Sequence, residues 1–384
     1  MTEPNADLLP EGLEDRLPRE AAATTRVMRG IQDVMHGHGY DRVLPPMIEF
    51  EKSLASRMDG INPLESGRRM FRFVDPASLR MMALRSDHTP QIGRIAETRL
   101  AASPRPLRLC YAGQVLTIKG DGLDPARERL QCGAELIGAD NVAAACEIVS
   151  IAIEALQASG ARGVSVDFTL PDLVDTLAAK AFPLEAQQIV AVRRELDTKD
   201  AGGLVDAGGE AYVPLLYATG DFDTAIEKLA AIDANGQGRG ALAGRIAALR
   251  EIVATLGGTA RLTLDPSERH GFEYQSWLGF TLYAEGVRGA LGRGGTYRIA
   301  GSGAKGQGGE AATGFSLYPD ALIALVTGTE RAEDCVFLPL GHDRETAARL
   351  RSIGWRTVAA LDAGDSAAAL GCTHVLQGGE PARL

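Results

Sequence analysis

The glycine-rich stretch near the C-terminal third of the chain is the first motif whose spacing points to a known chemistry. Residues 301–306 read G-S-G-A-K-G and match the pattern G-x-G-x-x-G. A dinucleotide site needs this turn between a strand and a helix, because the N-terminus of that helix faces the pyrophosphate. Here Gln307-Gly308-Gly309-Glu310 follows, and no helix begins. The stretch from Gly301 to Gly309 therefore favours a mobile loop over a dinucleotide site.

Cysteine and histidine positions indicate neither a metal centre nor a nucleophile. The five cysteines are scattered, odd in number and without C-x-x-C spacing, which argues against disulfides and zinc. His36 and His38 are the only close pair of histidines, and on a helix they would lie on opposite sides. The chain has no G-x-S-x-G, P-loop or H-E-x-x-H motif. We predict no metal, no cofactor and a reducing, cytoplasmic environment.

Polar side chains recur at alternate positions of one strand-like segment. Arg129, Gln131 and Glu135 are spaced by two or four residues, with Gly133 between them. Alternate residues of a strand lie on one face of a sheet, so these side chains should point the same way. Such a row is suited to binding a polar ligand, but rows of this kind also often pair only with neighbouring strands.

Composition and charge place the chain among globular proteins. It has 384 residues, of which 45% are hydrophobic and 23% charged, enough for two or three domains. No segment approaches the ~18 apolar residues of a membrane-spanning helix, and the polar N-terminus does not resemble a secretory signal. The formal net charge of −10 weighs against a nucleic-acid partner.

The elements that would position these residues alternate between helices and strands. Before residue 160 the patterns predict helices over 18–38, 85–100 and 141–159. They also predict a hairpin over 71–84 and strands over 107–119 and 129–138. Residues 165–258 are rich in alanine, leucine and charge, which predicts a mostly helical insertion. Strand patterns return at 260–265, 280–283 and 314–317. The last segment predicts a small α/β unit: strand 336–340, helix 344–353, strand 356–361, a helix, and strand 374–376.

Seven segments resemble, in the same order, the motifs of the histidyl-tRNA synthetase family. The first holds Gly12, Asp15 and Pro18 and continues through residues 39–45. Three later ones correspond to the family's R-P-E-x-T segment and to the two strands of its second class-defining motif, at 85–94, 108–113 and 127–138. The remaining three are His270-Gly271-Phe272-Glu273-Tyr274, Gly294-Gly295-Thr296-Tyr297 and Gly314-Phe315-Ser316-Leu317. The resemblance covers roughly residues 9–325.

This resemblance implies an α+β fold with the antiparallel sheet core of the class II aminoacyl-tRNA synthetases, flanked by helices. The expected domains are a first part of the core (1–164), the mostly helical insertion (165–258), a second part of the core (259–328) and the small C-terminal α/β unit (329–384). Such cores pair as two-fold dimers, so the resemblance also implies a homodimer.

The positions at which the family handles ATP carry different residues in this chain. The resemblance places Thr117, His270 and Ala321 where the family has phosphate-binding arginines, and Lys119 where it has the glutamate that seats adenine. Activation of an amino acid needs positive charge on the phosphates, and losing one such contact costs about 10²–10³ in rate. The loss of three predicts that adenylation does not occur.

The amino-acid side of the family's pocket is better kept. By resemblance, Asp87 and Thr89 would hold the α-amino group of histidine, Gln131 its backbone, and Glu135 would accept a hydrogen bond from the imidazole. The resemblance assigns four further residues to this histidine pocket: His270, Tyr274, Gln275 and Tyr297. Gln275 departs from the family, which has a tyrosine there, and its amide can both donate and accept.

These features together resemble those synthetase paralogues that serve as regulatory subunits of ATP phosphoribosyltransferase. The resemblance implies a non-catalytic protein that binds a short-form ATP phosphoribosyltransferase catalytic subunit, is required for the first step of histidine biosynthesis, and conveys feedback inhibition by L-histidine as effector. The C-terminal unit, at roughly fifty residues, is short for an anticodon reader, so we do not expect tRNA as a partner. The alternatives are a divergent histidyl-tRNA synthetase or other ATP-dependent amino-acid ligase, and an amino-acid-binding or protein-docking module.

Overall fold

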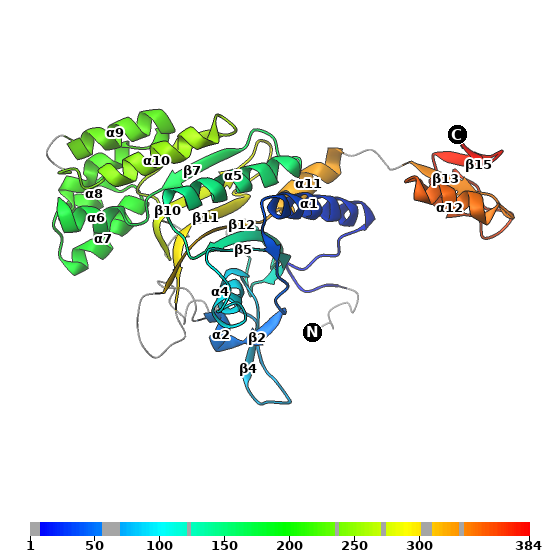
Figure 1. Ribbon diagram of the computed structural model, residues 1–384, viewed down its shortest axis with the longest axis horizontal. Helices are drawn as coiled ribbons and strands as arrows, with labels where there is room; N and C mark the ends of the chain where they lie inside the picture. The colour runs from blue at the N-terminus through cyan, green and yellow to red at the C-terminus, as the bar shows by residue number, and fades with distance from the viewer. Residues whose placement is uncertain are drawn as a thin grey trace, which may run out of the picture. The chain divides into compact units, whose positions relative to one another are not determined.

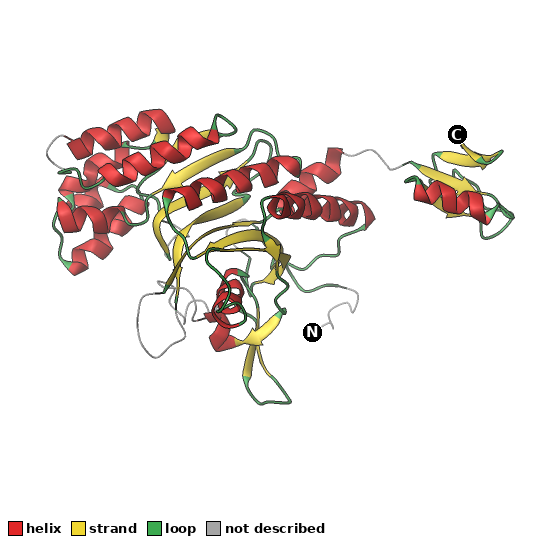
Figure 2. Ribbon diagram, viewed as in Figure 1, coloured by secondary structure: helices red, strands yellow, loops and turns green. Residues whose placement is uncertain are grey.

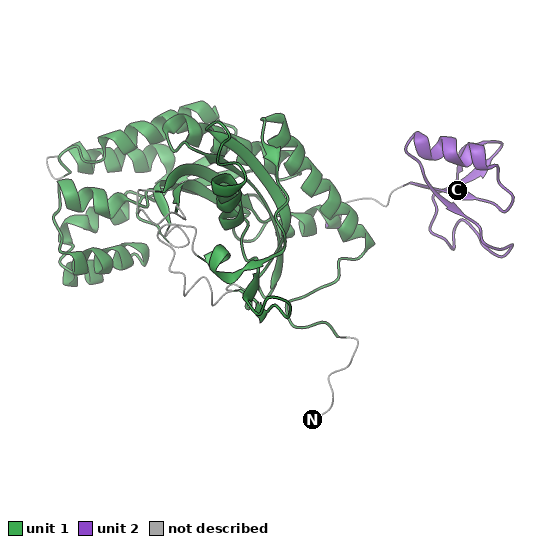
Figure 3. Ribbon diagram, turned by 60° about the horizontal axis from the view of Figure 1, so that its bottom comes forward, with its two compact units in different colours: residues 1–327 green, residues 328–384 purple. Residues whose placement is uncertain are grey.

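The computed structural model describes residues 8–55, 70–120, 124–234, 238–269, 274–300, 309–329 and 334–384 (Figure 1). The chain forms two compact units, residues 1–327 and residues 328–384 (Figure 3). Among the described residues, no helix combines the length and the apolar character that crossing a lipid bilayer requires.

A nine-stranded sheet is the centre of the first unit. Its strand order is β1-β5-β6-β12-β11-β10-β7-β9-β8. The strands, in chain order, are β1 (Asp41–Arg42), β5 (Leu107–Leu116), β6 (Glu128–Ile137), β7 (Ser165–Thr169), β8 (Gly220–Asp221), β9 (Arg261–Leu264), β10 (Gln275–Tyr283), β11 (Gly292–Ile299) and β12 (Glu310–Leu317). Neighbours are antiparallel except for the β1–β5 and β7–β9 pairs, which are parallel. The expected α+β fold, an antiparallel sheet core flanked by helices, is confirmed.

Two long helices cover one face of this sheet, and a shorter helix packs on the other. Helices α1 (Pro18–Gly37) and α5 (Val142–Ala158) lie side by side over β5, β6 and β12 (Figure 1). The side chain of Asn141 caps α5 by accepting a hydrogen bond from the backbone of Ala144. On the opposite face, α4 (Thr89–Thr98) packs against the sheet through Ile92 and Ala96.

Strand β6 divides its side chains between these two faces. Its even-numbered residues Cys132, Ala134 and Leu136 are buried in the core with α1 and α5. Its odd-numbered residues Gln131 and Glu135 therefore point to the α4 face. One strand thus contributes both to the hydrophobic core and to a set of polar residues on the opposite face.

A small three-stranded sheet precedes α4. It pairs β2 (Ile48–Phe50), β4 (Met81–Leu84) and β3 (Arg72–Val74) in that order, all antiparallel, and the short helix α2 (Glu51–Ala55) follows β2. The predicted hairpin over 71–84 is present as β3 and β4. Arg94 of α4 forms a bidentate ion pair with Glu49 of β2, which joins this sheet to the helix.

Helices fill the segment between β7 and β9 (Figure 2). They are α6 (Leu173–Lys180), α7 (Ala186–Asp197), α8 (Ala201–Asp206), the 3₁₀ helix η1 (Glu210–Tyr217), α9 (Phe222–Ala234) and α10 (Ala243–Leu256). The first strand of the predicted insertion, β7, pairs with β10 in the main sheet, so the helical part begins only at Leu173. The bounds of the four expected domains stay predictions.

Helix α11 (Asp320–Thr329) follows β12, and its last two residues belong to the second unit. Residues 334–384 of this unit form helix α12 (Arg344–Ser352) and a four-stranded sheet of order β14-β13-β15-β16. Its strands are β14 (Arg356–Ala359), β13 (Cys335–Leu338), β15 (His374–Gln377) and β16 (Glu380–Arg383).

The prediction of a second helix in the C-terminal unit was wrong, because residues 360–373 form turns. Asp365 accepts hydrogen bonds from the backbone of Leu361 and Asp362, and Asp362 accepts one from Gly364. These side chains satisfy backbone groups that a helix would otherwise pair, which favours turns. Strand β16 was not predicted.

Candidate functional site: a buried polar cluster around Glu135 and Gln131

The predicted ligand residues of α4, β6 and β11 meet on the α4 face of the sheet. Thr89 is the first residue of α4, and Asp87 lies two residues before it, with Oδ1 accepting a hydrogen bond from the Thr89 backbone at 2.9 Å. Gln131 and Glu135 come from β6 and Tyr297 from β11. The structure thus brings these five residues together.

Glu135 lies at the centre of one half of the cluster and is almost fully buried. Its Oε1 accepts hydrogen bonds from the hydroxyls of Thr89 at 3.1 Å and Tyr111 at 3.3 Å, and its Oε2 accepts one from Tyr297 at 2.7 Å. Burial raises the pKa of Glu135 to about 8, although these three hydrogen bonds oppose the shift. A carboxyl group of this kind readily gains or loses a proton near neutral pH.

Gln131 organises the other half. Its Nε2 donates to Asp87 Oδ1 and to Ser316 Oγ, both at 2.8 Å, and its Oε1 accepts from the backbone N–H of His88 at 2.9 Å. The same Oε1 lies 2.8 Å from Nδ1 of His88. Because an amide oxygen only accepts, Nδ1 of His88 carries a proton.

His88 is a neutral imidazole stacked on a phenol. Its ring lies 4.8 Å from the ring of Tyr111 at an interplanar angle of 15°. Burial lowers the pKa of His88 to about 4, and the charge of Arg85 acts in the same direction. The Gln131 hydrogen bond opposes the shift without reversing it.

Glycines make room for these side chains. A Cβ atom on Gly314 would lie 1.7 Å from Glu135 Oε2, and one on Gly133 would lie 2.3 Å from the hydroxyl oxygen of Tyr111. A Cβ on Gly113 would lie 2.6 Å from the guanidinium of Arg85. The cluster therefore occupies space that any larger residue at these glycines would fill.

Two further predicted residues border the cluster. The ring of Tyr274 meets that of Tyr297 edge to face, with centroids 6.0 Å apart. Gln275 lies opposite Tyr297 in the sheet, and its Oε1 is buried without a hydrogen-bond partner among the described residues. Leaving such an acceptor unpaired costs about 1–3 kcal/mol, so it is a natural partner for a ligand N–H group. His270 lies outside the described residues.

Of the predicted ATP positions, Thr117, Lys119 and Ala321 lie among the described residues and His270 does not. The Thr117 hydroxyl donates to the backbone carbonyl of Lys119 at 2.9 Å, and both Lys119 and Ala321 are exposed. Two arginines of the neighbouring segment stack on aromatic rings. The Arg129 guanidinium lies 4.7 Å from the ring centre of Tyr318, and the Arg127 guanidinium lies 4.8 Å from the ring centre of Phe71.

Sequence reasoning missed several residues that complete the cluster: His88, Tyr111, Ser316 and Tyr318. Ser316 bonds both Gln131 and the hydroxyl of Tyr111, at 2.8 Å each. The alternation of Gly314, Ser316 and Tyr318 is the signal that places the last two on the same side as Gln131. The stacking of His88 on Tyr111 joins two residues that are 23 positions apart in the sequence, so no local pattern predicts it.

Comparison with known proteins gives a consistent relationship. A sequence model of the histidyl-tRNA synthetase family matches residues 12–322. The ATP phosphoribosyltransferase regulatory subunit of Rhodospirillum centenum is 42% identical over 98% of this chain and 96% of its own length. The protein of the same name from Paramagnetospirillum magneticum is also 42% identical, over 97% and 96%.

Solved structures show the same fold at lower identity. A Bacillus halodurans protein described as an ATP phosphoribosyltransferase regulatory subunit/histidyl-tRNA synthetase has a TM-score of 0.77 at 21% identity, covering 97% of both chains. A histidyl-tRNA synthetase from a Nostoc species has a TM-score of 0.78 at 15% identity, covering 97% of this chain and 91% of that one.

Proposed function

Because the chain belongs to the histidyl-tRNA synthetase-like family of ATP phosphoribosyltransferase regulatory subunits, we propose that it binds a short-form ATP phosphoribosyltransferase catalytic subunit and conveys feedback inhibition by L-histidine. In this role it supports the first step of histidine biosynthesis in the cytoplasm, as a homodimeric core that performs no catalysis itself.

The buried polar cluster is the observation that carries the histidine part of this proposal. A histidine ligand offers a cationic amine, a carboxylate and a flat ring with two nitrogens. The half-buried carboxylate of Asp87 suits the amine. The carboxyl of Glu135 is an acceptor for a ring N–H group, and so is Oε1 of Gln275, which has no partner in the described part of the chain. Buried acceptors of this kind discriminate strongly against ligands that lack the matching donor.

The absence of positive charge at Thr117 and Ala321 supports a non-catalytic role. Phosphoryl and adenylyl transfer need fixed cations where negative charge develops. The uncharged side chain of Thr117 is held by the carbonyl of Lys119, and Ala321 has no polar atom beyond its backbone. We expect no histidine-dependent exchange of pyrophosphate into ATP.

Calorimetric titration of L-histidine tests the proposal, first with the chain alone and then with the chain mixed with a short-form ATP phosphoribosyltransferase catalytic subunit. We expect binding that appears or tightens in the mixture, together with histidine-dependent inhibition of the catalytic subunit. Allosteric coupling requires that histidine bind the inhibited assembly more tightly than the active one. No association between the two proteins, or exchange of pyrophosphate driven by histidine, would reject it.

A further inference from the structure

Strand β10 contains a β-bulge where it reaches the polar cluster. Gln275 lies opposite Tyr297 of β11, whereas Gly279 lies opposite Gly295, so the register shifts by two residues between these pairs. The three residues between Gln275 and Gly279 therefore face a single residue of β11. Bulges bend a strand locally and often lie beside functional sites, where they change the direction of a side chain.

The bulge determines which side chain reaches the cluster. Without the shift, Trp277 would lie opposite Tyr297, and Gln275 would lie two residues farther along β11, a distance of about 7 Å. In the structure Trp277 is instead buried in the core with α5, as is the next residue, Leu278. The amide of Gln275 thus occupies the place beside Tyr297 that a regular strand would give to the indole.

Thr296 stabilises the bulge from the neighbouring strand. It is the residue of β11 that faces the bulge, and it is fully buried. Its Oγ1 accepts hydrogen bonds from the backbone N–H groups of Trp277 at 3.2 Å and Leu278 at 3.1 Å, and from the Ser276 hydroxyl at 2.8 Å. Buried backbone N–H groups need partners, and a bulge disrupts the regular ladder that would supply them. The Thr296 hydroxyl supplies them here.

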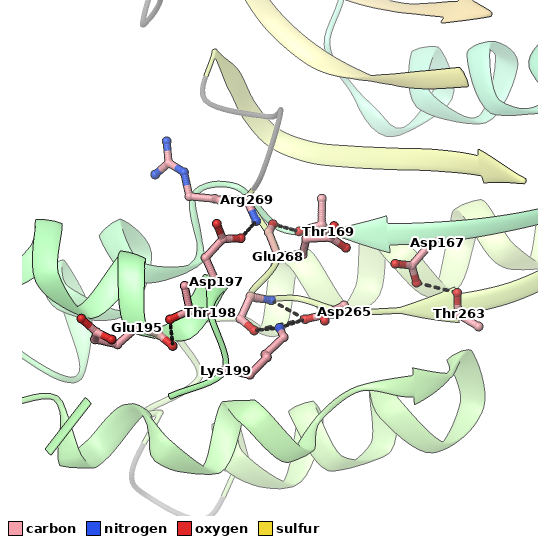
Figure 4. A network of polar contacts seen from close by, with 11 residues as sticks. Asp167, Thr169, Glu195, Asp197, Thr198, Lys199, Thr263, Asp265, Glu268 and Arg269 are labelled. Atoms are coloured by element: carbon pink, nitrogen blue, oxygen red, sulfur yellow. Dashed lines mark hydrogen bonds and ion pairs between the residues drawn. The ribbon is translucent and has the colours of Figure 1, made fainter. Parts of the chain in front are cut away.

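The far end of the bulge is fixed on both sides. Gly279 pairs with β11 and also with Thr169 of β7. The Thr169 hydroxyl donates to the backbone carbonyl of Glu268, within a network of polar contacts that includes the loop after β9 (Figure 4). Because these contacts fix β10 from Gly279 onward, loss of the Thr296 hydroxyl should move the segment before it, which carries Gln275.

Two glycines bring Gln275 and Glu135 to the same face of the sheet. Gly295 lies directly opposite Gly314, so Cβ atoms on these residues would be about 4.5–5.5 Å apart. A Cβ on Gly295 would lie 2.7 Å from Gln275 Oε1, and one on Gly314 would lie 1.7 Å from Glu135 Oε2. The two oxygens are therefore within about 10 Å of each other, and one small ligand can contact both.

We propose that Thr296 is a positioning residue for the histidine site, because its hydroxyl stabilises the bulge that directs Gln275 Oε1 toward a ring N–H group of the ligand. Neighbouring residues of a strand point to opposite faces, so Thr296 points away from the face of Tyr297 and does not contact the ligand. This inference rests on the proposed histidine site and adds the residue that sets the position of one of its acceptors.

The test measures the Kd of L-histidine by calorimetry for the full chain mixed with the catalytic subunit. Thr296→Val keeps the shape of the side chain but lacks the hydroxyl, and it should weaken binding about tenfold, as expected for the loss of one ligand hydrogen bond. Thr296→Ser keeps the hydroxyl and should bind like the wild type. Ser276→Ala removes one of the three hydrogen bonds and should weaken binding about two- to threefold. This milder variant decides the test if Thr296→Val does not fold.

Thr313→Val is the matched control. Thr313 lies directly opposite Thr296 on β12, is equally buried, and donates its hydroxyl to the carbonyl of Ala139 at 2.9 Å, away from the bulge. It should lower the free energy of unfolding and leave the Kd unchanged. A role in folding alone would instead give both valine variants the same Kd.

A double-mutant cycle shows whether Thr296 acts through Gln275. Gln275→Leu removes the acceptor, so adding Thr296→Val to it should weaken binding little further. Wild-type affinity in Thr296→Val, equal Kd values for Thr296→Val and Thr313→Val, or additive effects in the cycle would overturn this inference and leave the proposed function standing. No histidine binding by the wild-type mixture would overturn both.

Discussion

Glu135 lies directly opposite Gly314 in the sheet, so close that a Cβ atom on Gly314 would be 1.7 Å from the carboxylate oxygen Oε2. That oxygen also accepts the hydrogen bond from Tyr297. Because Gly314 has no side chain, the Glu135 carboxyl can occupy this space and accept its hydrogen bonds.

Gly314→Ala should displace Glu135 and destabilise the fold by about 1–3 kcal/mol, the usual cost of overpacking a filled interior. Urea denaturation measures the change in the free energy of unfolding. Gly244→Ala is the control, because a Cβ built at this position in α10 meets no atom within 4 Å apart from its chain neighbours and the backbone of its own helix. Removing glycine from a helix stabilises by up to about 1 kcal/mol, so the control should be at least as stable as the wild type. Unchanged stability of Gly314→Ala would contradict the close packing of Glu135 on residue 314.

The raised pKa of Glu135 predicts a stability that falls as pH rises. In the folded state the carboxyl keeps its proton up to pH about 8, whereas in the unfolded chain it loses it near 4.5. Between these values the folded state binds more protons, so the free energy of unfolding falls by up to about 1.4 kcal/mol per pH unit. Glu135→Gln should remove this slope. Denaturant titrations at pH 5.5 and 8 measure the change in the free energy of unfolding between these pH values. An equal change in the wild type and in Glu135→Gln would contradict the raised pKa of Glu135.

His88 predicts the opposite dependence at lower pH. Its folded pKa of about 4 lies below the ordinary value of 6.5, so the unfolded chain binds more protons as the pH falls between these values. Stability from this group is complete above about pH 6.5 and is lost toward pH 4. His88→Asn keeps a donor for Gln131 but does not titrate, so its loss of stability between pH 7 and 4.5 should be smaller. The exposed His36→Asn, expected to follow the wild type, is the control.

Replacing Thr89 should weaken inhibition by histidine more than it destabilises helix α4. Thr89→Val removes the hydroxyl that donates to Glu135 and keeps the shape of the side chain. We expect the histidine concentration for half-inhibition of the catalytic subunit to rise about tenfold. Thr98→Val, at the exposed end of the same helix, should leave inhibition unchanged. Equal inhibition constants for both variants would remove Thr89 from the site.

Most of the long strands and helices were predictable from the sequence, whereas β7 was assigned to the helical insertion and the glycine-rich strand β11 was missed. The alternation in β6 predicted a strand with a polar face. Strand β11 was missed because Gly292, Gly294 and Gly295 have low strand propensity. The role of these glycines depends on strand pairing. A Cβ on Gly294, for example, would lie 2.3 Å from the ring of Phe280 on the neighbouring strand, so glycine leaves room for that ring.

The site was partly predictable for a related reason. Asp87, Thr89, Gln131 and Glu135 were found because they keep the order and spacing of a family pattern, and the structure places them together. The stacking of His88 on Tyr111 and the Ser316 hydrogen bonds depend on which strands become neighbours. That information lies in the long-range pairing of β5, β6 and β12, which a local pattern does not contain.

The alternation of β6 also limits the kinds of mutation that this protein tolerates. Its even residues build the core with α1 and α5, and its odd residues build the polar cluster. Inserting or deleting one residue would exchange the two sets, placing Glu135 against the helices and Ala134 among the tyrosines. Point substitutions can therefore change the polar cluster one side chain at a time, whereas a single-codon insertion or deletion in this strand would disrupt the core and the cluster together.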